Sequence, residues 1–345
     1  MINGVVMKIF ILFIITILCC GCQPIVKENI AELNKFNDRQ LVKYDKEKYP
    51  LFIENINSLC EDETYKYNKP PQRVVAVWQN SIETLMALGV GDRIIAGIGV
   101  PSDKYFRPEY RAQYRKIPYT SLQNLDIETI LMLEPDIIIG WFSTFSPKVL
   151  RTTDFWHKRG IGTYIAPSST PEKDRRVLSS EYQDIVNLGK IFDREEIANR
   201  IVNSMKKEIE FVTSRAKNFE KKPRGLVVEL SGKEMIVYGE KTLVGDIIRH
   251  LGAEQLAAKY TSISAEQILE LDPDALFIVV IESNYGNEES IKKRITNHKA
   301  LKHLRCVKNN RVYTIPLYAI YSSGVRTYDG IKILANGLYP ELYKE

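Results

Sequence analysis

Cysteine, histidine and long apolar runs are all scarce in this 345-residue sequence. Three of the five cysteines lie within the first 22 residues, so the folded part has no disulfide framework. The other two, Cys60 and Cys306, are too few to hold an iron–sulfur cluster, and we expect two buried, unpaired thiols. Of the four scattered histidines, His298 and His303 are five apart, a spacing that disfavours a bare zinc or manganese site.

Recognised catalytic motifs are also missing. The sequence contains no Gly-x-Ser-x-Gly elbow, no phosphate-binding loop and no His-Glu-x-x-His. The formal charge is only +5 and the positive residues are spread along the chain, so no nucleic-acid partner is expected. These absences favour a binding protein that is not an enzyme. An exported α/β enzyme with a cleft is the alternative class.

The N-terminus has the pattern of an export sequence. Lys8 precedes a short apolar run, residues 9–20, and Gly21-Cys22 follows it. The run is too short for a comfortable membrane span. Gly21-Cys22 resembles the lipobox of bacterial lipoproteins, in which the cysteine is lipidated. We therefore predict an extracytoplasmic protein that is lipid-anchored to a bacterial membrane through Cys22, in the periplasm or at the cell surface; an uncleaved anchor is the alternative.

The longest periodic stretch, residues 193–222, predicts one long helix. Asp193 can cap it as part of a capping box with Glu196, and Pro223 ends it. Such a helix would be about 40 Å long, enough to form a strut between two lobes; an ordinary surface helix is the alternative. Its apolar residues recur every three or four positions, on one face: Ile197, Ile201, Met205, Ile209, Val212, Ala216 and Phe219.

Strands and helices alternate on both sides of this helix, which indicates α/β units with mainly parallel sheets. Residues 127–136 also align with residues 265–274 at an offset of 138, with Glu, Ile, Leu, Leu, Pro and Asp identical. We predict two similar Rossmann-like lobes, joined by one long rigid helix, with a ligand cleft between them. The predicted parts are a signal peptide (1–22), a flexible tether (23–49), an N-terminal lobe (50–192), the inter-lobe helix (193–222) and a C-terminal lobe (223–345).

Six segments then occur in a characteristic order: residues 73–77, 83–90, 125–139, 188–190, 264–278 and 309–316. Together they resemble the class III solute-binding proteins of ABC importers, which bind ferric siderophores, haem or cobalamin. The resemblance covers about residues 50–345. It implies a fold of two α/β lobes on one rigid helix, and an importer subunit as opposed to an enzyme. The implied partners are a small metal chelate and an ABC permease dimer with its cytoplasmic ATPase; we expect the receptor itself to be a monomer.

Ligands of open α/β sheets bind beyond the carboxyl ends of the strands, so the loops there should face the cleft. Aromatic rings in these loops suit a bulky planar ligand, although each ring could instead only pack at a strand end. Lys233 and Arg326 would suit a ferric complex of net negative charge. Tyr318 or Tyr321 could ligate the iron of haem; no other direct metal ligand is expected. The candidate ligand-binding residues are Trp78, Gln79, Asn80, Tyr105, Trp141, Phe142, Lys233, Tyr285, Tyr318, Tyr321 and Arg326.

The resemblance also implies a docking role for Glu128 and Glu266, which fall at matching points near the starts of matching helices. In the family, glutamates at these positions meet arginines of the two permease subunits. The alternative is that each only favours its helix N-terminus. We predict a receptor for a ferric siderophore or haem, bound as ligand and not as cofactor. A cobalamin receptor is the runner-up, because Trp141 sits where the cobalamin binder also has tryptophan.

Overall fold

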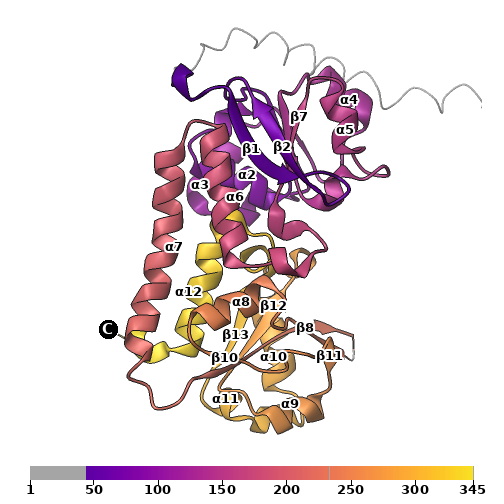
Figure 1. Ribbon diagram of the computed structural model, residues 1–345. Coiled ribbons are helices and arrows are strands. Elements are labelled where there is room, and N and C mark those ends of the chain that lie inside the picture. Colours follow the sequence, from indigo (N-terminus) through magenta and orange to yellow (C-terminus); the bar gives the residue numbers. More distant parts are fainter. Residues whose placement is uncertain (1–43, 233, 345) are drawn as a thin grey trace, which may run out of the picture.

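The computed structural model describes residues 44–232 and 234–344, which form two α/β lobes joined by one long helix (Figure 1). The predicted signal peptide with Cys22, most of the predicted tether, and Lys233 lie outside the described residues. In the part of the chain that is described, none of the helices combines the length and apolarity needed to cross a bilayer. The predicted fold class is confirmed.

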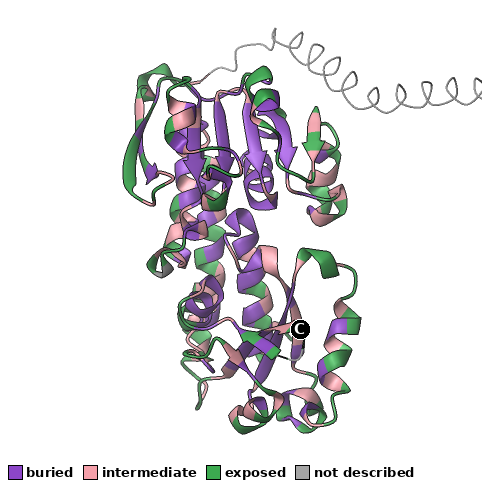
Figure 2. Ribbon diagram, turned by 90° about the vertical axis from the view of Figure 1, so that its right-hand side faces the viewer, coloured by how far each residue is buried: buried purple, intermediate pink, exposed green. Residues whose placement is uncertain are grey.

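The N-lobe is built on a five-stranded parallel sheet in the order β5-β4-β3-β6-β7. Helices cover this sheet, so its central strands are buried apolar runs (Figure 2). An antiparallel hairpin of β1 and β2 precedes the sheet. The elements are β1 (Leu51–Ile56), β2 (Asp62–Tyr67), β3 (Val74–Val77), α2 (Gln79–Ala87), β4 (Ile94–Ile98), α3 (Pro108–Tyr114), β5 (Tyr119–Ser121), α4 (Ile127–Met132), β6 (Ile137–Gly140), α5 (Thr153–His157), β7 (Gly162–Ile165) and α6 (Leu178–Ile191).

The C-lobe sheet has the order β11-β9-β8-β12-β13, with β10 added beside β8. Its centre is parallel, but β8 and β9 form an antiparallel hairpin that the sequence analysis did not predict. Gly232 therefore lies in the turn of this hairpin. The elements are β8 (Arg224–Ser231), β9 (Glu234–Val237), α8 (Leu243–His250), β10 (Glu254–Gln255), β11 (Ser262–Ile263), α9 (Ala265–Leu271), β12 (Ala275–Val280), α10 (Glu288–Thr296), α11 (Arg305–Lys308), β13 (Val312–Pro316) and α12 (Thr327–Leu338).

The sequence repeat is also a structural repeat. Just after each of α4 and α9 the chain passes through a residue with left-handed backbone, with φ of 44° at Glu134 and 41° at Asp272. The arginine at the start of the lobe's first central strand, Arg73 or Arg224, donates to the free carbonyls at that helix end. The aspartate after the shared proline accepts a hydrogen bond from the backbone N–H of the same arginine. The same local arrangement of helix end, arginine and aspartate therefore occurs once in each lobe.

The long helix α7 (Glu195–Ala216) runs along the side of both lobes and packs against α6 and α12 (Figure 1). It is shorter than predicted at both ends, and the predicted capping by Asp193 is wrong. Asp193 has φ of 56°, and its carboxylate instead accepts from Lys48 Nζ at 2.8 Å. The N-cap position is held by Arg194, without a side-chain cap. The predicted apolar stripe does pack against the core.

A second connection between the lobes forms around Glu181 of α6. Its buried carboxylate accepts hydrogen bonds from the backbone N–H groups of Ser323 and Gly324, at 3.1 and 2.7 Å. The hydroxyls of Ser168 and Thr327 donate to it as well. Burial raises the pKa of the Glu181 carboxyl, whereas these donors lower it. These hydrogen bonds therefore fix the chain before α12 to the N-lobe, and none of them involves α7.

Candidate ligand-binding cleft

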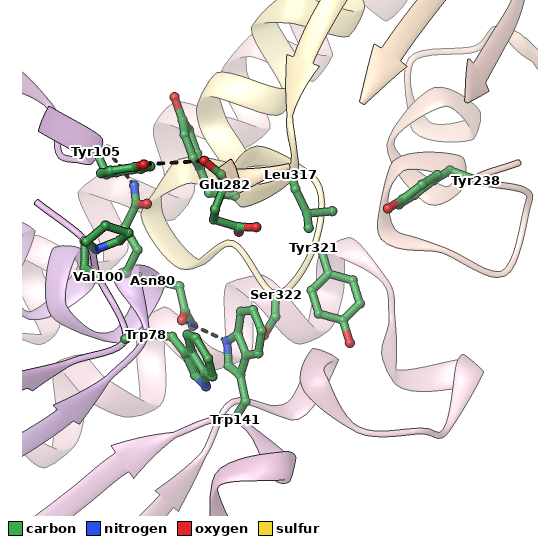
Figure 3. Close-up of a pocket in the computed structure, with 14 residues that line it drawn as sticks. Trp78, Asn80, Val100, Tyr105, Trp141, Tyr238, Glu282, Leu317, Tyr321 and Ser322 are labelled. Atoms are coloured by element: carbon green, nitrogen blue, oxygen red, sulfur yellow. Dashed lines mark hydrogen bonds between the residues drawn. The ribbon is translucent and has the colours of Figure 1, made fainter. Parts of the chain in front are cut away.

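A cavity of about 320 Å³ lies between the lobes, beyond the carboxyl ends of β3, β4 and β6 (Figure 3). This is the position expected for a ligand site in parallel α/β sheets. Seven of the eleven predicted ligand residues line it: Trp78, Gln79, Asn80, Tyr105, Trp141, Tyr318 and Tyr321. The other residues of its wall are Gly99, Val100, Pro101, Tyr238, Glu282, Leu317 and Ser322.

Two stacked indoles form the N-lobe wall. The rings of Trp78 and Trp141 lie 5.1 Å apart between centroids, 25° from parallel, and Tyr321 meets Trp141 edge-on at 5.4 Å. The indole N–H of Trp141 donates to the side-chain oxygen of Asn80 at 2.8 Å, which fixes the ring's orientation. Side chains from both lobes thus build one aromatic surface, with a preset geometry, for a flat ligand.

The backbone at Trp78 is strained. Its φ of 72° and ψ of 155° fall in a region that is almost restricted to glycine. The ring is accommodated because Gly99, itself at φ of 88°, has no side chain: a Cβ there would lie 2.7 Å from the Trp78 ring. Strain of this kind is found mainly at functional sites, where the surrounding structure holds it.

Two tyrosines of the wall, Tyr105 and Tyr318, close one end of the cavity, and Tyr285 packs behind them. The ring of Tyr285 lies 4.9 Å from that of Tyr105 and 5.4 Å from that of Tyr318. Burial raises the pKa values of Tyr285, Tyr318 and Tyr238, so these phenols keep their protons near neutral pH. The Tyr318 phenol can donate a hydrogen bond to a ligand, whereas the Tyr238 hydroxyl already donates to Glu229. To ligate ferric iron as phenolate, Tyr318 would first have to lose a proton against this shift.

Glu282 is the one charged residue among the described residues that line the cavity. A second carboxylate, Glu229, lies behind the wall and accepts a hydrogen bond from the hydroxyl of Tyr238 at 2.8 Å. The two expected cations are not on the wall, since Lys233 lies outside the described residues and Arg326 points elsewhere. The described residues therefore form a wall that is mainly aromatic and carries one carboxylate.

Arg326 is 7% exposed and belongs to a buried ion-pair network between the lobes. Its Nε donates to Glu83 at 2.9 Å, and its other nitrogens donate to Asp329 and to the backbone oxygen of Tyr105. Arg107 extends the network to Asp329 at 2.7 Å. These partners occupy the guanidinium, so the structure does not support the predicted contact between Arg326 and the ligand.

Two further predicted residues are also off this cavity. Phe142 packs against the N-lobe core beside β6, and its backbone N–H donates to Ser169. Tyr285 lies behind Tyr105 and lines a different cavity. The sequence analysis missed Tyr238, because it did not predict the hairpin of β8 and β9. The available sequence signal was the turn pair Ser231-Gly232 between the apolar stretches of residues 226–228 and 235–238. Within the described part of the chain, no cluster of His, Cys, Asp or Glu could hold a bare metal ion.

A family model described as "Periplasmic binding protein" matches residues 74–319. The chain belongs to this family. A solved periplasmic binding protein from Veillonella parvula is 39% identical, with a TM-score of 0.84 over 89% of this chain and 97% of that one. Members of the family are transport receptors and not enzymes, and their partners are a small-molecule ligand and an ABC permease with its ATPase.

Curated relatives have lower identity but broad coverage. An ABC transporter substrate-binding lipoprotein of Bacillus subtilis is 24% identical over 88% of this chain and 90% of its own length. The petrobactin-binding protein of the same organism is 26% identical over 75% and 79%. A vitamin B12-binding protein of Vibrio campbellii is 24% identical over 61% and 71%. The relatives thus include proteins named for binding petrobactin and vitamin B12.

The two glutamates predicted to dock onto a permease are both exposed in this periplasmic binding protein. Glu128 lies in the first turn of α4 and Glu266 in the first turn of α9. Neither glutamate is the cap of its helix, because Asp126 and Ser264 provide the side-chain caps. Hydrogen bonds from its own backbone N–H and from Ser264 do lower the pKa of Glu266. Both glutamate side chains are therefore available to a partner.

Proposed function

We propose that this protein is an extracytoplasmic receptor, lipid-anchored through Cys22, that binds a ferric chelate and delivers it to an ABC permease. The chelate would be a siderophore complex or haem. The observation that carries the proposal is the aromatic cavity between two lobes, in which Trp78 and Trp141 present a preset flat surface. The petrobactin-binding relative supports an iron complex as ligand.

A cobalamin receptor is the second candidate. The described residues of the cavity wall include no arginine or lysine, whereas they include Glu282. A strongly anionic ferric complex would gain no charge-assisted hydrogen bond from such a wall. A neutral or cationic chelate, such as a cobalamin, needs no charge-assisted hydrogen bond from a cation, so this wall would not weaken its binding. The vitamin B12-binding relative supports this alternative.

Docking to the permease would use α4 and α9, which lie in different lobes (Figure 1). The offset of 138 that relates Glu128 to Glu266 also relates Leu131 to Leu269, which are 36% and 37% exposed. Each helix therefore presents a carboxylate with an exposed leucine one turn further on. Matching patches on two similar lobes suit a partner with two-fold symmetry that offers a cation and an apolar contact twice.

The lipid anchor would reach the protein at the N-lobe. Where the described chain begins, Lys48 binds Asp193 at 2.8 Å and Glu195 at 3.0 Å, beside the start of α7. The described chain therefore enters the fold at the N-lobe end of α7. The lipoprotein relative supports this membrane location.

Tryptophan fluorescence tests the receptor function directly. Trp78 and Trp141 line the cavity, whereas Trp156 is fully buried in the N-lobe core and does not touch the site. The full chain, purified in mild detergent, is titrated with a ferric hydroxamate, a ferric catecholate, haemin and cyanocobalamin in turn. We expect saturable quenching by one class at sub-micromolar concentration. Flat traces with every class would contradict the proposal.

Docking is tested by reversing both charges, with Glu128→Lys and Glu266→Lys combined. We expect uptake of the bound probe by cells to be lost while its affinity for the purified receptor is unchanged. The matched control is Glu210→Lys with Glu220→Lys, two exposed glutamates on or just after α7. Loss of ligand binding in the first pair, or equal loss of uptake in both pairs, would refute docking through these helices.

A further inference from the structure

A second cavity, of about 630 Å³, lies on the far side of two of the tyrosines that close the first. Tyr105 and Tyr318 line both cavities, so these two side chains separate them. We call the first the front cavity and the second the rear cavity. Both lobes contribute to the rear cavity, whose walls are Lys104, Tyr105, Val280, Tyr285, Gly286, Glu288, Thr314, Pro316, Tyr318 and Ile333.

Tyr105 is the N-lobe residue that separates the two cavities, and its side chain makes only weak contacts. It ends a three-residue 3₁₀ turn (Asp103–Tyr105), and its side chain is half-buried. Its hydroxyl donates one long hydrogen bond, 3.4 Å, to the backbone oxygen of Glu282 across the cleft (Figure 3). Its ring only tilts against Tyr285. A rotation of this side chain would remove the N-lobe residue that separates the two cavities, without moving either lobe.

The two cavities differ in chemistry. The front cavity is walled by indoles and phenols, which suit a flat or bulky chelate. The rear cavity adds an ammonium at Lys104, a carboxylate at Glu288 and a hydroxyl at Thr314. Pockets that bury drug-sized ligands measure about 300–1,000 Å³, and metal chelates of the proposed classes are at the large end of that range. The front cavity alone is at the small end.

We propose that the ligand site continues past Tyr105 into the rear cavity, so that the ligand is a metal chelate carrying an extended polar arm. The chelate lies against the indoles, and the arm passes Tyr105 to reach the polar groups of the rear cavity. Side groups that hydrogen-bond, or that carry charge of either sign, would match Lys104 and Glu288. This inference rests on the proposed function, because it concerns the same ligand.

Filling the rear cavity tests this directly. Thr314→Phe adds a ring inside the rear cavity, at a strand residue that does not line the front cavity. Phenylalanine leaves the tryptophan signal unaltered. For the probe that saturates the unmodified protein, we expect the Kd to rise at least about tenfold, since overpacking of a filled site costs this much. The matched control is Thr120→Phe, at an exposed threonine of β5, for which the Kd should not change.

The outcomes separate the two proposals. If none of the four probes quenches the unmodified protein, the proposed function fails, and this inference with it. If a probe binds and Thr314→Phe has the same Kd, the ligand is confined to the front cavity and only this inference is overturned. Circular dichroism and thermal melting verify that the variant folds.

A thiol at the same position gives a second measurement that needs no added bulk. In a Cys60→Ser background, Thr314→Cys is alkylated with N-ethylmaleimide and the rate is measured at residue 314 by mass spectrometry. Cys306 does not interfere, because burial raises the pKa of its thiol to about 11. We expect the saturating probe to slow alkylation several-fold there but not at Thr120→Cys. Equal rates with and without the probe would overturn the inference.

Discussion

At the scale of single residues, the site depends on a contact between a strained tryptophan and a glycine. Gly99→Ala would place a Cβ 2.7 Å from the Trp78 ring and would also strain its own backbone at φ of 88°. We expect a loss of about 1 kcal/mol or more in the free energy of unfolding, together with weaker ligand binding. Urea unfolding and fluorescence titration measure the two effects.

Gly160→Ala is the control for Gly99→Ala. It separates the effect of backbone strain from the effect of the clash with the Trp78 ring. Gly160 has φ of 74°, but a Cβ there would meet nothing within 4 Å. The control should therefore lose stability to a similar backbone effect while keeping its ligand affinity. If Gly99→Ala also keeps its affinity, the position of the Trp78 ring does not matter for binding.

Arg326 gives a second prediction at this scale. Replacing it with methionine leaves Glu83, which is fully buried, without its cation. Breaking a buried pair in this way costs about 3–5 kcal/mol of unfolding free energy. Arg107→Met, which removes a partly exposed partner of Asp329, should cost less. If Arg326→Met instead keeps full stability and loses only ligand affinity, the contact predicted from the sequence is correct.

The aromatic residues of the site were predictable, and Arg326 was not, for a physical reason. Trp78 and Trp141 each follow a buried apolar strand, and the ends of parallel strands converge on one edge. In the sequence, a cation in a polar loop gives no sign of whether its partner is a ligand or a carboxylate of the protein. The partner that occupies Arg326 lies 243 residues earlier in the chain, and no local pattern connects the two.

At the scale of elements, α6 carries a buried acid that makes stability depend on pH. Burial, with a contribution from the nearby charge of Glu181, raises the pKa of Asp184 to about 8. The folded state therefore keeps a proton that the unfolded chain releases near pH 4. The free energy of unfolding should fall by up to about 1.4 kcal/mol per pH unit as the pH rises from about 4 to about 8.

Asp184→Asn removes this titration and should flatten the slope between pH 5.5 and pH 8. Glu181 keeps its own raised pKa, so a smaller slope should remain. Urea unfolding at several pH values is the measurement, and Asp154→Asn at an exposed site is the control. A slope in Asp184→Asn as steep as in the unmodified protein would show that Asp184 does not hold the proton.

The elements themselves were predicted unevenly. The apolar stripe located α7, because periodicity depends on the face that packs. Its N-terminus was mispredicted, because Asp193 has a partner in Lys48, 145 residues earlier, that a local capping rule cannot include. The antiparallel hairpin of β8 and β9 was missed because β9 has only four residues and is half exposed, so it gives little strand signal beside the longer β8.

At the scale of the whole molecule, the internal repeat was enough to predict two similar lobes, since each copy carries its own helix end, proline and strand. The division of the cleft into two cavities was not predictable, because it depends on side-chain positions of Tyr105 and Tyr318 from different lobes.

Lobe movement should be small. α7 packs on both α6 and α12, and two buried networks, around Glu181 and around Arg326, join the lobes near the cleft. We expect the radius of gyration from small-angle X-ray scattering to be the same, within error, with and without a saturating probe. A clear decrease on binding would mean that these networks break and that the lobes close as a hinge.

The stacked indoles have one further consequence. Two such rings, 5.1 Å apart and nearly parallel, share their electronic excitations. The pair should therefore give an exciton couplet in circular dichroism that neither chromophore gives alone. A ligand that rotates or separates the rings would abolish the couplet. Circular dichroism would then detect ligand binding without an added label.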